Sequence, residues 1–428
     1  MTAVEKILAR ASGKESVRPG DIVYPEPDFI LVHDGLIAPS KQQLDNLGIT
    51  RLHDPDKMIF VTDHEVIQLS ERSIERIRQN RDAAEAWGVK RFYDAGQGGH
   101  GHLFPMERGI VTPGTFYFDN DRHCTSVGGM GAVGFRVGAE IITVLATGTV
   151  WTKVPSTLRI SLKGQLQKGV YARDVGFYLA SGLKDGGFLQ VEMDYRVLEF
   201  AGDLDQFPLS ERVALTNSPT EMRAYAVFVP PSEDIIAYAR ERAERPFEPV
   251  YSDPDAAFDG DIEVDISKLQ PQVAITGSPA NAVNLSEVSG RPIQHAFIGS
   301  CGSGMWDDLV TAATILAGKR LAPGVRLFVV PGTEDSMKRL TAEGLMGTFV
   351  EAGAFVLPAG CGLCSSNPLG PLSAGEASIS TASANERGRF RGSRDAEMYL
   401  GSPATVAASA LAGKIADPRE QMTSGQGE

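Results

Sequence analysis

This sequence has little cysteine and no long apolar run, and each absence narrows what the chain can be. Its 428 residues include only 4 cysteines. In a reducing cytosol, so few cysteines suit metal binding, catalysis or a buried core better than a disulfide framework. The opening segment MTAVEKILARASGKE mixes charged and apolar residues, and it lacks an apolar stretch long enough for a signal peptide or a membrane span. We therefore expect a cytoplasmic protein without a membrane segment.

Positive charge is also scarce. The chain has 41 Lys and Arg residues against 54 Asp and Glu residues, a formal net charge of -13. No long stretch rich in Lys and Arg offsets this balance, which argues against a nucleic-acid partner. With 42% hydrophobic residues, the composition is that of a globular protein with material for two or three cores. An anionic ligand would have to be held by local cations.

Helical and strand-like patterns alternate along the chain, which predicts α/β layers. Residues 70–89 have helix-forming composition after a Ser cap candidate, and residues 57–67 form a β-rich run. Residues 246–292 are dense in Pro, Asp, Gly and Ser, with one strand-like piece in their middle. We therefore expect an N-terminal α/β part over 1–245, a connecting segment over 246–292 and a C-terminal α/β domain over 293–428.

In the C-terminal part, 293–428, the sequence pattern predicts strands that are each followed by a turn. Strands are expected in 292–301, 325–333 and 354–364, with helices over 306–318 and 335–353 between them. Turns at the carboxyl ends of such strands gather at one edge of the sheet, where ligands bind. The predicted turns carry Cys301 and the pair formed by Cys361 and Cys364.

Several chemistries suit these cysteines. The CGLC spacing is that of a dithiol redox site, although such a motif is expected early in a small βαβ domain. A structural zinc ion wants four ligands, and only His295 is near Cys301 in the sequence. Buried, inert cysteines are a further alternative. An iron–sulfur cluster with three cysteine ligands would leave one iron open to act as a Lewis acid, which suits loss or addition of water at a hydroxy acid.

Several motifs, taken in order, resemble the aconitase superfamily, specifically the large subunits of 3-isopropylmalate dehydratase and homoaconitase. In the N-terminal half these are VEKILARASGKE, HDG, FVTDHEV, DNDRHCTSVGGMGAVG and LEFAGD. In the C-terminal half they are FIGSCGSG, GCGLCSSNP, SISTASANERGR and EMYLGSPATVAASALAGKIADPRE. The match covers nearly the whole chain. It implies an aconitase-type large subunit of α/β/α layered domains around a cluster-binding cleft.

The resemblance also implies a cofactor and a partner. A 4Fe-4S cluster is expected on Cys301, Cys361 and Cys364, with an open iron that binds the substrate hydroxyl and a carboxylate. In family members the catalytic base is a serine on a separate small subunit. The chain ends just after IADPREQMTSGQGE, without the swivelling C-terminal domain of other members, so we expect a heteromer with such a small subunit.

Catalytic residues are carried over from the family motifs onto positions of this chain. Asp63 and His64 match its Asp–His pair, in which a carboxylate raises the basicity of an imidazole that protonates the departing hydroxyl. Asp121 and His123 match a second acidic–His element, and Glu199 matches its acidic position.

Other positions depart from the family pattern, mostly where substrate is expected to bind. Arg122 and Cys124 replace the Ser and Thr of an Asp-Ser-His-Thr element, and we expect Cys124 to be a Thr-sized replacement rather than a cluster ligand. Ser303 stands where an Asn is expected in GSCTNG. The family's Gly-x-x-His-Gln element becomes GQGGHGHLFP, which leaves His100 or His102 as displaced substitutes.

The segment SANERGR keeps Asn385 and Arg389 of the family's substrate-binding motif, but Ala384 replaces its first Arg. Because an Arg fork is the natural partner of a carboxylate, the loss predicts a changed substrate. We expect a hydro-lyase acting on an anionic malate-type hydroxy diacid, either similar to 3-isopropylmalate or a different branched malate such as 2,3-dimethylmalate. The alternative is a non-catalytic member whose cluster senses iron or oxygen.

Overall fold

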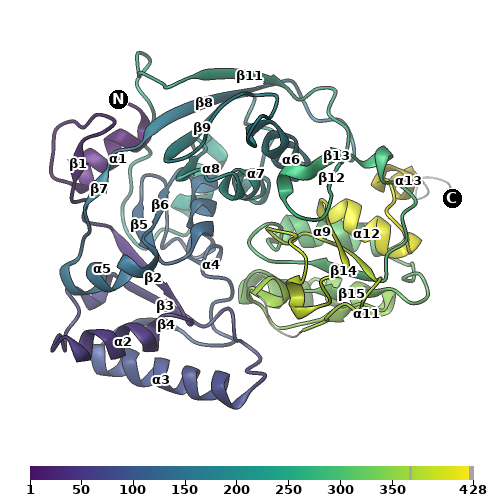
Figure 1. The fold of residues 1–428 in the computed structure, drawn as a ribbon, viewed down its shortest axis with the longest axis horizontal. Coiled ribbons are helices and arrows are strands. Elements are labelled where there is room, and N and C mark those ends of the chain that lie inside the picture. Colours follow the sequence, from purple (N-terminus) through teal and green to yellow (C-terminus); the bar gives the residue numbers. More distant parts are fainter. Residues whose placement is uncertain (366–368, 424–428) are drawn as a thin grey trace. The chain divides into compact units, whose positions relative to one another are not determined.

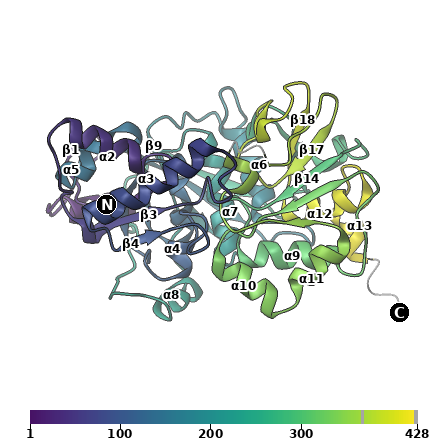
Figure 2. The same cartoon turned by 90° about the horizontal axis from the view of Figure 1, so that it is seen from below.

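The computed structural model describes residues 1–365 and 369–423, and the chain packs into two compact units. Unit 1 comprises Met1–Leu162, Met193–Leu209 and Arg223–Val264, and unit 2 comprises the intervening segments and the remainder of the chain. The last three residues of the GCGLCSSNP motif, 366–368, and residues 424–428 lie outside the described residues. Figures 1 and 2 give two views of the ribbon.

Three sheets belong mainly to unit 1. The five-stranded sheet is parallel throughout, with the order β4-β3-β2-β5-β6. The four-stranded sheet has the order β10-β9-β8-β11, and β1 pairs with β7 in a small antiparallel ribbon. These strands are β1 (Ile22–Val23), β2 (Phe29–His33), β3 (Met58–Val61), β4 (Arg91–Tyr93), β5 (Phe116–Asp119), β6 (Val133–Arg136), β7 (Thr152–Lys153), β8 (Ser156–Lys163), β9 (Arg196–Gly202), β10 (Ala226–Phe228) and β11 (Asp261–Asp265).

Helices cover both faces of the five-stranded sheet. Trp87 of α3 packs on Phe60 of β3, and Phe104 of α4 packs on Tyr93 of β4. Both views accordingly place β3 and β4 between these helices (Figures 1 and 2). The helices of this unit are α1 (Ala3–Ala11), α2 (Ile37–Asn46), α3 (Glu71–Trp87), α4 (Phe104–Glu107), α5 (Ile141–Thr147), α8 (Glu233–Arg240) and the 3-10 helices η1 (Pro55–Lys57), η2 (Arg122–Met130) and η3 (Gly138–Glu140).

Unit 2 is built on a seven-stranded sheet with the order β13-β12-β18-β17-β14-β15-β16. The strands from β18 to β16 are parallel, and β12 joins β18 and β13 in antiparallel pairs. Small and aliphatic residues of α9 and α12 share one core with β14 and β15. The strands are β12 (Gln272–Ala274), β13 (Ala282–Asn284), β14 (His295–Ile298), β15 (Arg326–Val329), β16 (Phe355–Val356), β17 (Ala377–Ser380) and β18 (Glu397–Leu400).

The helices of unit 2 connect these strands. They are α6 (Ala172–Leu183), α7 (Leu209–Glu221), α9 (Trp306–Leu316), α10 (Glu334–Ala342), α11 (Leu345–Ala352), α12 (Pro403–Ala412), α13 (Pro418–Thr423) and the 3-10 helices η4 (Pro279–Asn281), η5 (Leu285–Glu287), η6 (Gly362–Ser365) and η7 (Arg389–Arg391). Among the described residues, none of the helices combines the length and the apolar character that crossing a bilayer requires.

The α/β class expected from the sequence is confirmed, and two local expectations are corrected. Residues 335–353 form two helices rather than one, because Gly344 has a left-handed backbone with φ 79° that ends one helix and begins the next. Residues 246–292 contain three strands rather than one. The division into an N-terminal part over 1–245, a connecting segment over 246–292 and a C-terminal domain over 293–428 stays a prediction.

A close backbone contact in unit 1 fixes the helix that carries the DNDRHC motif. Gly128 of η2 accepts a hydrogen bond from the Val229 amide at 3.0 Å. A Cβ atom on Gly128 would lie 1.8 Å from the Val227 carbonyl oxygen. The sheet strand and η2 therefore approach so closely that only glycine fits between them.

We expect Gly128→Ala to lower the free energy of unfolding by about 1–3 kcal/mol, because the methyl group must push η2 away from β10. Denaturant unfolding followed by circular dichroism measures this change. Gly35→Ala is the matched control, since a Cβ atom there meets nothing within 4 Å. Equal stability of the two variants would contradict the close contact.

Candidate functional site

Acidic and histidine side chains gather at the carboxyl edge of the five-stranded sheet in unit 1. His33 ends β2, Asp119 ends β5, and Asp63 and His64 lie just after β3, beyond Thr62. Because neighbouring parallel strands end at the same edge, the sheet brings together residues that are far apart in the sequence. His102 approaches the same edge from the loop before α4.

Asp63 lies at the centre of this acid–histidine network. Its two carboxylate oxygens both lie 2.9 Å from Nδ1 of His33, and Oδ1 lies 2.7 Å from Nδ1 of His64. The backbone amide of Gly101 donates to Oδ2 at 2.8 Å. A Cβ atom on Gly101 would lie 2.8 Å from the His33 ring, so glycine is needed for this approach. Asp63 thus holds two imidazoles in fixed orientations.

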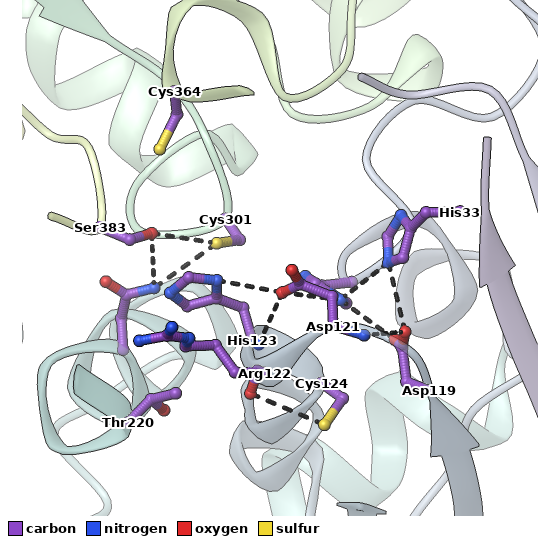
Figure 3. Close-up of polar contacts among 12 residues, drawn as sticks. His33, Asp119, Asp121, Arg122, His123, Cys124, Thr220, Cys301, Cys364 and Ser383 are labelled. Atoms are coloured by element: carbon purple, nitrogen blue, oxygen red, sulfur yellow. Dashed lines mark hydrogen bonds and ion pairs between the residues drawn. The ribbon is translucent and has the colours of Figure 1, made fainter. Parts of the chain in front are cut away.

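The network continues from His33 to the DNDRHC motif. Nε2 of His33 lies 3.1 Å from Nε2 of His102 and 3.4 Å from Oδ1 of Asp119, and His102 lies 3.1 Å from the other Asp119 oxygen. Asp119 accepts the Asp121 amide at 2.9 Å, and Asp121 in turn lies 3.2 Å from Nδ1 of His123. Figure 3 draws this part of the network. Both predicted Asp–His pairs therefore belong to one connected set.

Charge within the network follows from burial and from close opposite charges. Burial alone would lower the pKa of His33, but Asp63 and Asp119 raise it well above its usual value. His64 behaves alike, with burial opposed by Asp63 and Asp34. Burial would raise the pKa of Asp63, but the two imidazoles hold it well below its usual range. At neutral pH these groups therefore form an array of buried imidazolium and carboxylate charges.

Sequence reasoning did not place His33, Asp34 or Asp119 in the site. Each directly ends or follows a buried strand, and that position was the available signal. Asp34 accepts the backbone amides of His64 and Glu65 at 3.2 and 2.9 Å, so it shapes the turn that presents His64.

Glu199 lies in a different network of unit 1. It is 4% exposed, and the Ser252 hydroxyl donates to its two oxygens at 2.7 and 2.8 Å. Burial raises its pKa to about 7, against the lowering effects of Ser252 and Arg159. No contact recorded for the described residues joins Glu199 to the acid–histidine network. Its expected catalytic role stays a prediction.

The structure leaves Arg122 exposed and Cys124 buried in unit 1. The thiol of Cys124 lies 3.6 Å from the Arg122 carbonyl oxygen, and burial together with Asp119 and Asp121 raises its pKa well above the usual value. A protonated thiol is a poor metal ligand. This surrounding favours Cys124 as a packing residue.

The cysteines of unit 2 occupy turns that follow β14 and β16. Cys301 follows Ser300, whose φ of 67° is unusual for a residue other than glycine, and strain of this kind concentrates at functional sites. Cys361 precedes η6, and Cys364 lies within it. All four cysteines are buried, and none of them forms a disulfide bond.

Ser383 contacts two of these cysteines. Its hydroxyl lies 3.3 Å from Sγ of Cys301, and its backbone amide donates to the sulfur of Cys364. Asn217 of α7 adds a donor 3.5 Å from Sγ of Cys301 and a hydrogen bond of 3.2 Å to Ser383. In Figure 3 the sulfur of Cys364 points toward the pair formed by Cys301 and Ser383. The two cysteine turns therefore converge on one residue.

Cys364 is surrounded by donors that favour a thiolate. A hydrogen bond from Cys361 is the largest influence, and together with the Arg389 guanidinium it holds the pKa of Cys364 well below its usual value despite burial. Nη2 of Arg389 lies 3.4 Å from the sulfur, and Nη1 lies 3.1 Å from Glu386. Thiolates, not thiols, bind metals, so the donor set suits a metal group.

The remaining predicted residues of unit 2 make contacts with the backbone. The amide nitrogen of Asn385 donates to the carbonyl oxygens of Ile275 and Met398, both at 2.9 Å. The hydroxyl of Ser303 donates to the Gly302 carbonyl. These contacts hold the loops in place, and the expected substrate contacts of both residues stay predictions.

Comparisons with known proteins agree with this arrangement. Residues 5–413 match the family described as Aconitase family (aconitate hydratase). The chain is 38% identical over 423 residues to 3-isopropylmalate dehydratase large subunit 1 of Methanopyrus kandleri, covering 98% of this chain and 99% of that protein. It is 37% identical over 420 residues to the probable 3-isopropylmalate dehydratase large subunit of Methanothermobacter thermautotrophicus, covering 98% and 99%.

A solved structure shares the fold. The holo-form crystal structure of aconitase X from Thermococcus kodakaraensis matches with a TM-score of 0.50 and 12% identity, covering 89% of each chain. The fold, the acid–histidine network and the family match define an enzyme of the hydro-lyase class. The chain belongs to the aconitase family, which implies an iron–sulfur cluster.

We expect Asp63→Asn to lower the pKa values of His33 and His64, because it removes the carboxylate that both imidazoles share. The loss of a buried charge partner should lower the free energy of unfolding by about 3–5 kcal/mol. Histidine ring signals in nuclear magnetic resonance titrations and denaturant unfolding measure the two effects. Asp45→Asn is the control, since its exposed pair with Lys41 is worth at most about 1 kcal/mol.

The pH dependence of stability follows from the raised pKa values of the two imidazoles and the lowered pKa of Asp63. Imidazoles with raised pKa values stabilise the fold fully below about pH 6.5 and lose this contribution as the pH rises through their folded pKa. Asp63, whose pKa is depressed, stabilises the fold above about pH 3.9 and loses its contribution on acidification through its folded pKa. Wild-type imidazoles that titrate near their ordinary pKa would contradict the network.

We expect Glu199→Gln to stabilise the protein in alkaline solution and to have little effect in acid. A carboxyl group whose folded pKa is about 7 rather than 4.5 costs stability once it ionises, so the penalty grows from about pH 4.5 and is fully present above about pH 7. The gain above this range should reach about 1–3 kcal/mol.

Unfolding curves measured across this pH range test the effect. The exposed Glu15→Gln variant is the control and should leave the pH dependence unchanged. A Glu199→Gln variant as pH-dependent as the wild type would refute the assignment of the buried carboxyl.

Proposed function

We propose that this chain is the cluster-binding large subunit of an iron–sulfur hydro-lyase that adds water to, or removes it from, a malate-type hydroxy diacid. The observation that carries the proposal is the meeting of the cysteine turns at Ser383, which contacts both Cys301 and Cys364. The names of the curated relatives, 3-isopropylmalate dehydratase large subunits, support the substrate class.

The donor set fits the implied cofactor. Cys301, Cys361 and Cys364 are buried and form no disulfide bond, and the surroundings of Cys364 favour its thiolate. We propose that these three residues hold a 4Fe-4S cluster. With only three protein thiolates, such a cluster supplies an open iron that acts as a Lewis acid on a hydroxyl oxygen. Cys124, with its raised pKa, is left out of the ligand set.

Among the imidazoles of the acid–histidine network, His64 is the best candidate for the general acid. Its side chain is 31% exposed, against 15% for His123 and 3% for His33. Asp63 holds its Nδ1, and we propose that the imidazolium gives a proton to the departing hydroxyl. We propose that Asp63 and Asp34 keep this imidazole charged, because they raise its pKa against the effect of burial.

The base and part of the specificity are proposed to come from a partner. The curated relatives are named large subunits, which supports a heteromer in which a small subunit supplies a catalytic serine. Exposed Arg122, with Arg389, is proposed to meet the substrate carboxylates, because Ala384 offers no charge. A branched malate such as 2,3-dimethylmalate suits this changed charge pattern as well as 3-isopropylmalate does. We keep a cytoplasmic location as part of the proposal.

Single substitutions test the three-cysteine site. We expect the iron content to fall at least about tenfold in each of the variants Cys301→Ser, Cys361→Ser and Cys364→Ser. Even residues that only support a metal ligand change metal affinity by that factor. Cys124→Ser should retain as much iron as the wild type. Iron and sulfide analysis after anaerobic purification measures this, and iron loss in Cys124→Ser would instead make Cys124 a ligand.

Electron-resonance spectra with candidate hydroxy diacids test the activity class. A spectral change caused by one diacid, and its turnover once the small subunit is added, are expected of the hydro-lyase. An intact cluster that ignores every diacid in a broad panel would favour the iron- or oxygen-sensing alternative, which the replaced arginine at Ala384 motivates.

A further inference from the structure

Arg173 of α6 is a cation enclosed in the core of unit 2. Its side chain is 1% exposed and is among the largest fully buried side chains of the protein. The guanidinium lies over the Phe177 ring, 4.8 Å from its centroid. Burying a charge is costly unless an opposite charge or a full set of hydrogen bonds accompanies it. The stability of this buried guanidinium therefore depends on the groups around it.

The hydrogen-bond acceptors of Arg173 are all neutral. Nη1 donates to Oδ1 of Asn217 at 2.6 Å, and Nη2 donates to the Ala382 carbonyl oxygen at 2.7 Å. Nε has no hydrogen-bond partner, and among residues 1–365 and 369–423 the carboxylates that act on the guanidinium do so at longer range, without a hydrogen bond. Neutral acceptors satisfy hydrogen bonds, but they do not neutralise the charge.

Two of the anions that act on Arg173 are cysteine sulfurs. Burial lowers its pKa to about 10, and Cys301 is the first group that opposes this effect, followed by Asp308, Cys364 and Glu221. Burial raises the pKa of Asp308 well above its usual value, which disfavours its charged form. The sulfurs are therefore part of the negative charge that offsets the buried guanidinium.

Direct geometry ties Arg173 to the Cys301 turn. A Cβ atom on Gly302 would lie 2.8 Å from Nη1 of Arg173, so the guanidinium packs directly on the residue after Cys301. Asn217 forms a bridge, because it accepts from Arg173 and donates to Sγ of Cys301 at 3.5 Å. Two hydrogen bonds through the Asn217 amide therefore connect the guanidinium to the sulfur of Cys301.

We propose that Arg173 is the buried counter-charge of the metal–thiolate group on Cys301, Cys361 and Cys364, and that it makes this group easier to reduce. The inference rests on the proposed function. A one-electron reduction adds one negative charge to the group, and a nearby cation in a medium of low dielectric constant stabilises the reduced form more than the oxidised form. Arg173 is thus a positioning and electrostatic residue rather than a catalytic one.

Arg389 is the other cation near the sulfurs, but its surroundings differ. Its side chain is 22% exposed and pairs with Glu386 at 3.1 Å. Solvent and the carboxylate both weaken its field at the sulfurs. The two arginines are also linked by hydrogen bonds to different cysteines. Arg389 contacts the sulfur of Cys364 directly, whereas Arg173 lies in the core and is joined to Cys301 through Asn217.

The test compares Arg173→Met, which removes the charge, with Arg173→Lys, which keeps it. Redox titration followed by electron resonance measures the ratio of reduced to oxidised cluster at fixed poise. We expect this ratio to fall at least tenfold in Arg173→Met, equivalent to 59 mV for a one-electron couple, and to stay near the wild-type value in Arg173→Lys. Arg173→Gln, whose amide still donates to the neighbouring oxygens, replaces the Met variant if that variant does not fold.

Each outcome bears on the proposal. A Met or Gln variant with the wild-type potential would overturn the counter-charge. A Lys variant shifted as far as the neutral variant would also overturn it, because shape rather than charge would then matter. A wild-type protein that binds no iron after anaerobic reconstitution would refute the proposed function, and the inference with it. If the wild type binds a cluster but the neutral variant has the same reduction potential, the inference alone would be refuted.

Discussion

A charge that leaves water must find its opposite nearby, and this constraint governs the interior of both units. Asp63 has no exposed surface, yet it remains ionised because two imidazoles and the Gly101 amide surround its oxygens. The same contacts keep the imidazoles charged. A single carboxylate thus sets the orientation and the protonation of two histidines, and the strand ends that carry them must meet for either charge to be tolerated.

The parallel sheet is what makes this meeting possible. The end of β2 carries His33, the segment after β3 carries Asp63 and His64, and the end of β5 carries Asp119, so the network needs no long connecting loop. Gly101 and Gly128 allow two further segments to approach at distances that any side chain would prevent. Backbone packing and electrostatics are therefore coupled in unit 1, since displacing η2 also displaces Asp121 and His123 from Asp119.

Patterns along the chain predicted the local elements better than the partners of buried charges. Ser70 caps the start of α3 as expected from the sequence, and the acidic–His motifs were found from their resemblance to the family motifs. The division of 335–353 was missed because Gly344 is also tolerated inside helices. His33 and Arg173 were missed because their roles depend on neighbours 30 to 209 residues away in the chain. Pairing over such separations is a property of the tertiary fold.

The positions of the buried and paired arginines also affect how a diacid would be recognised. In unit 2 Arg173 faces the sulfurs from within the core, and the Asn385 amide is committed to backbone carbonyls. Arg389 already serves Cys364 and Glu386. Two carboxylates of a substrate would still require cations, and the position that supplies one in the family motif is Ala384 here. Because a carboxylate without a cation or donor is poorly bound, the missing charge must come from an exposed arginine such as Arg122 or from a partner chain.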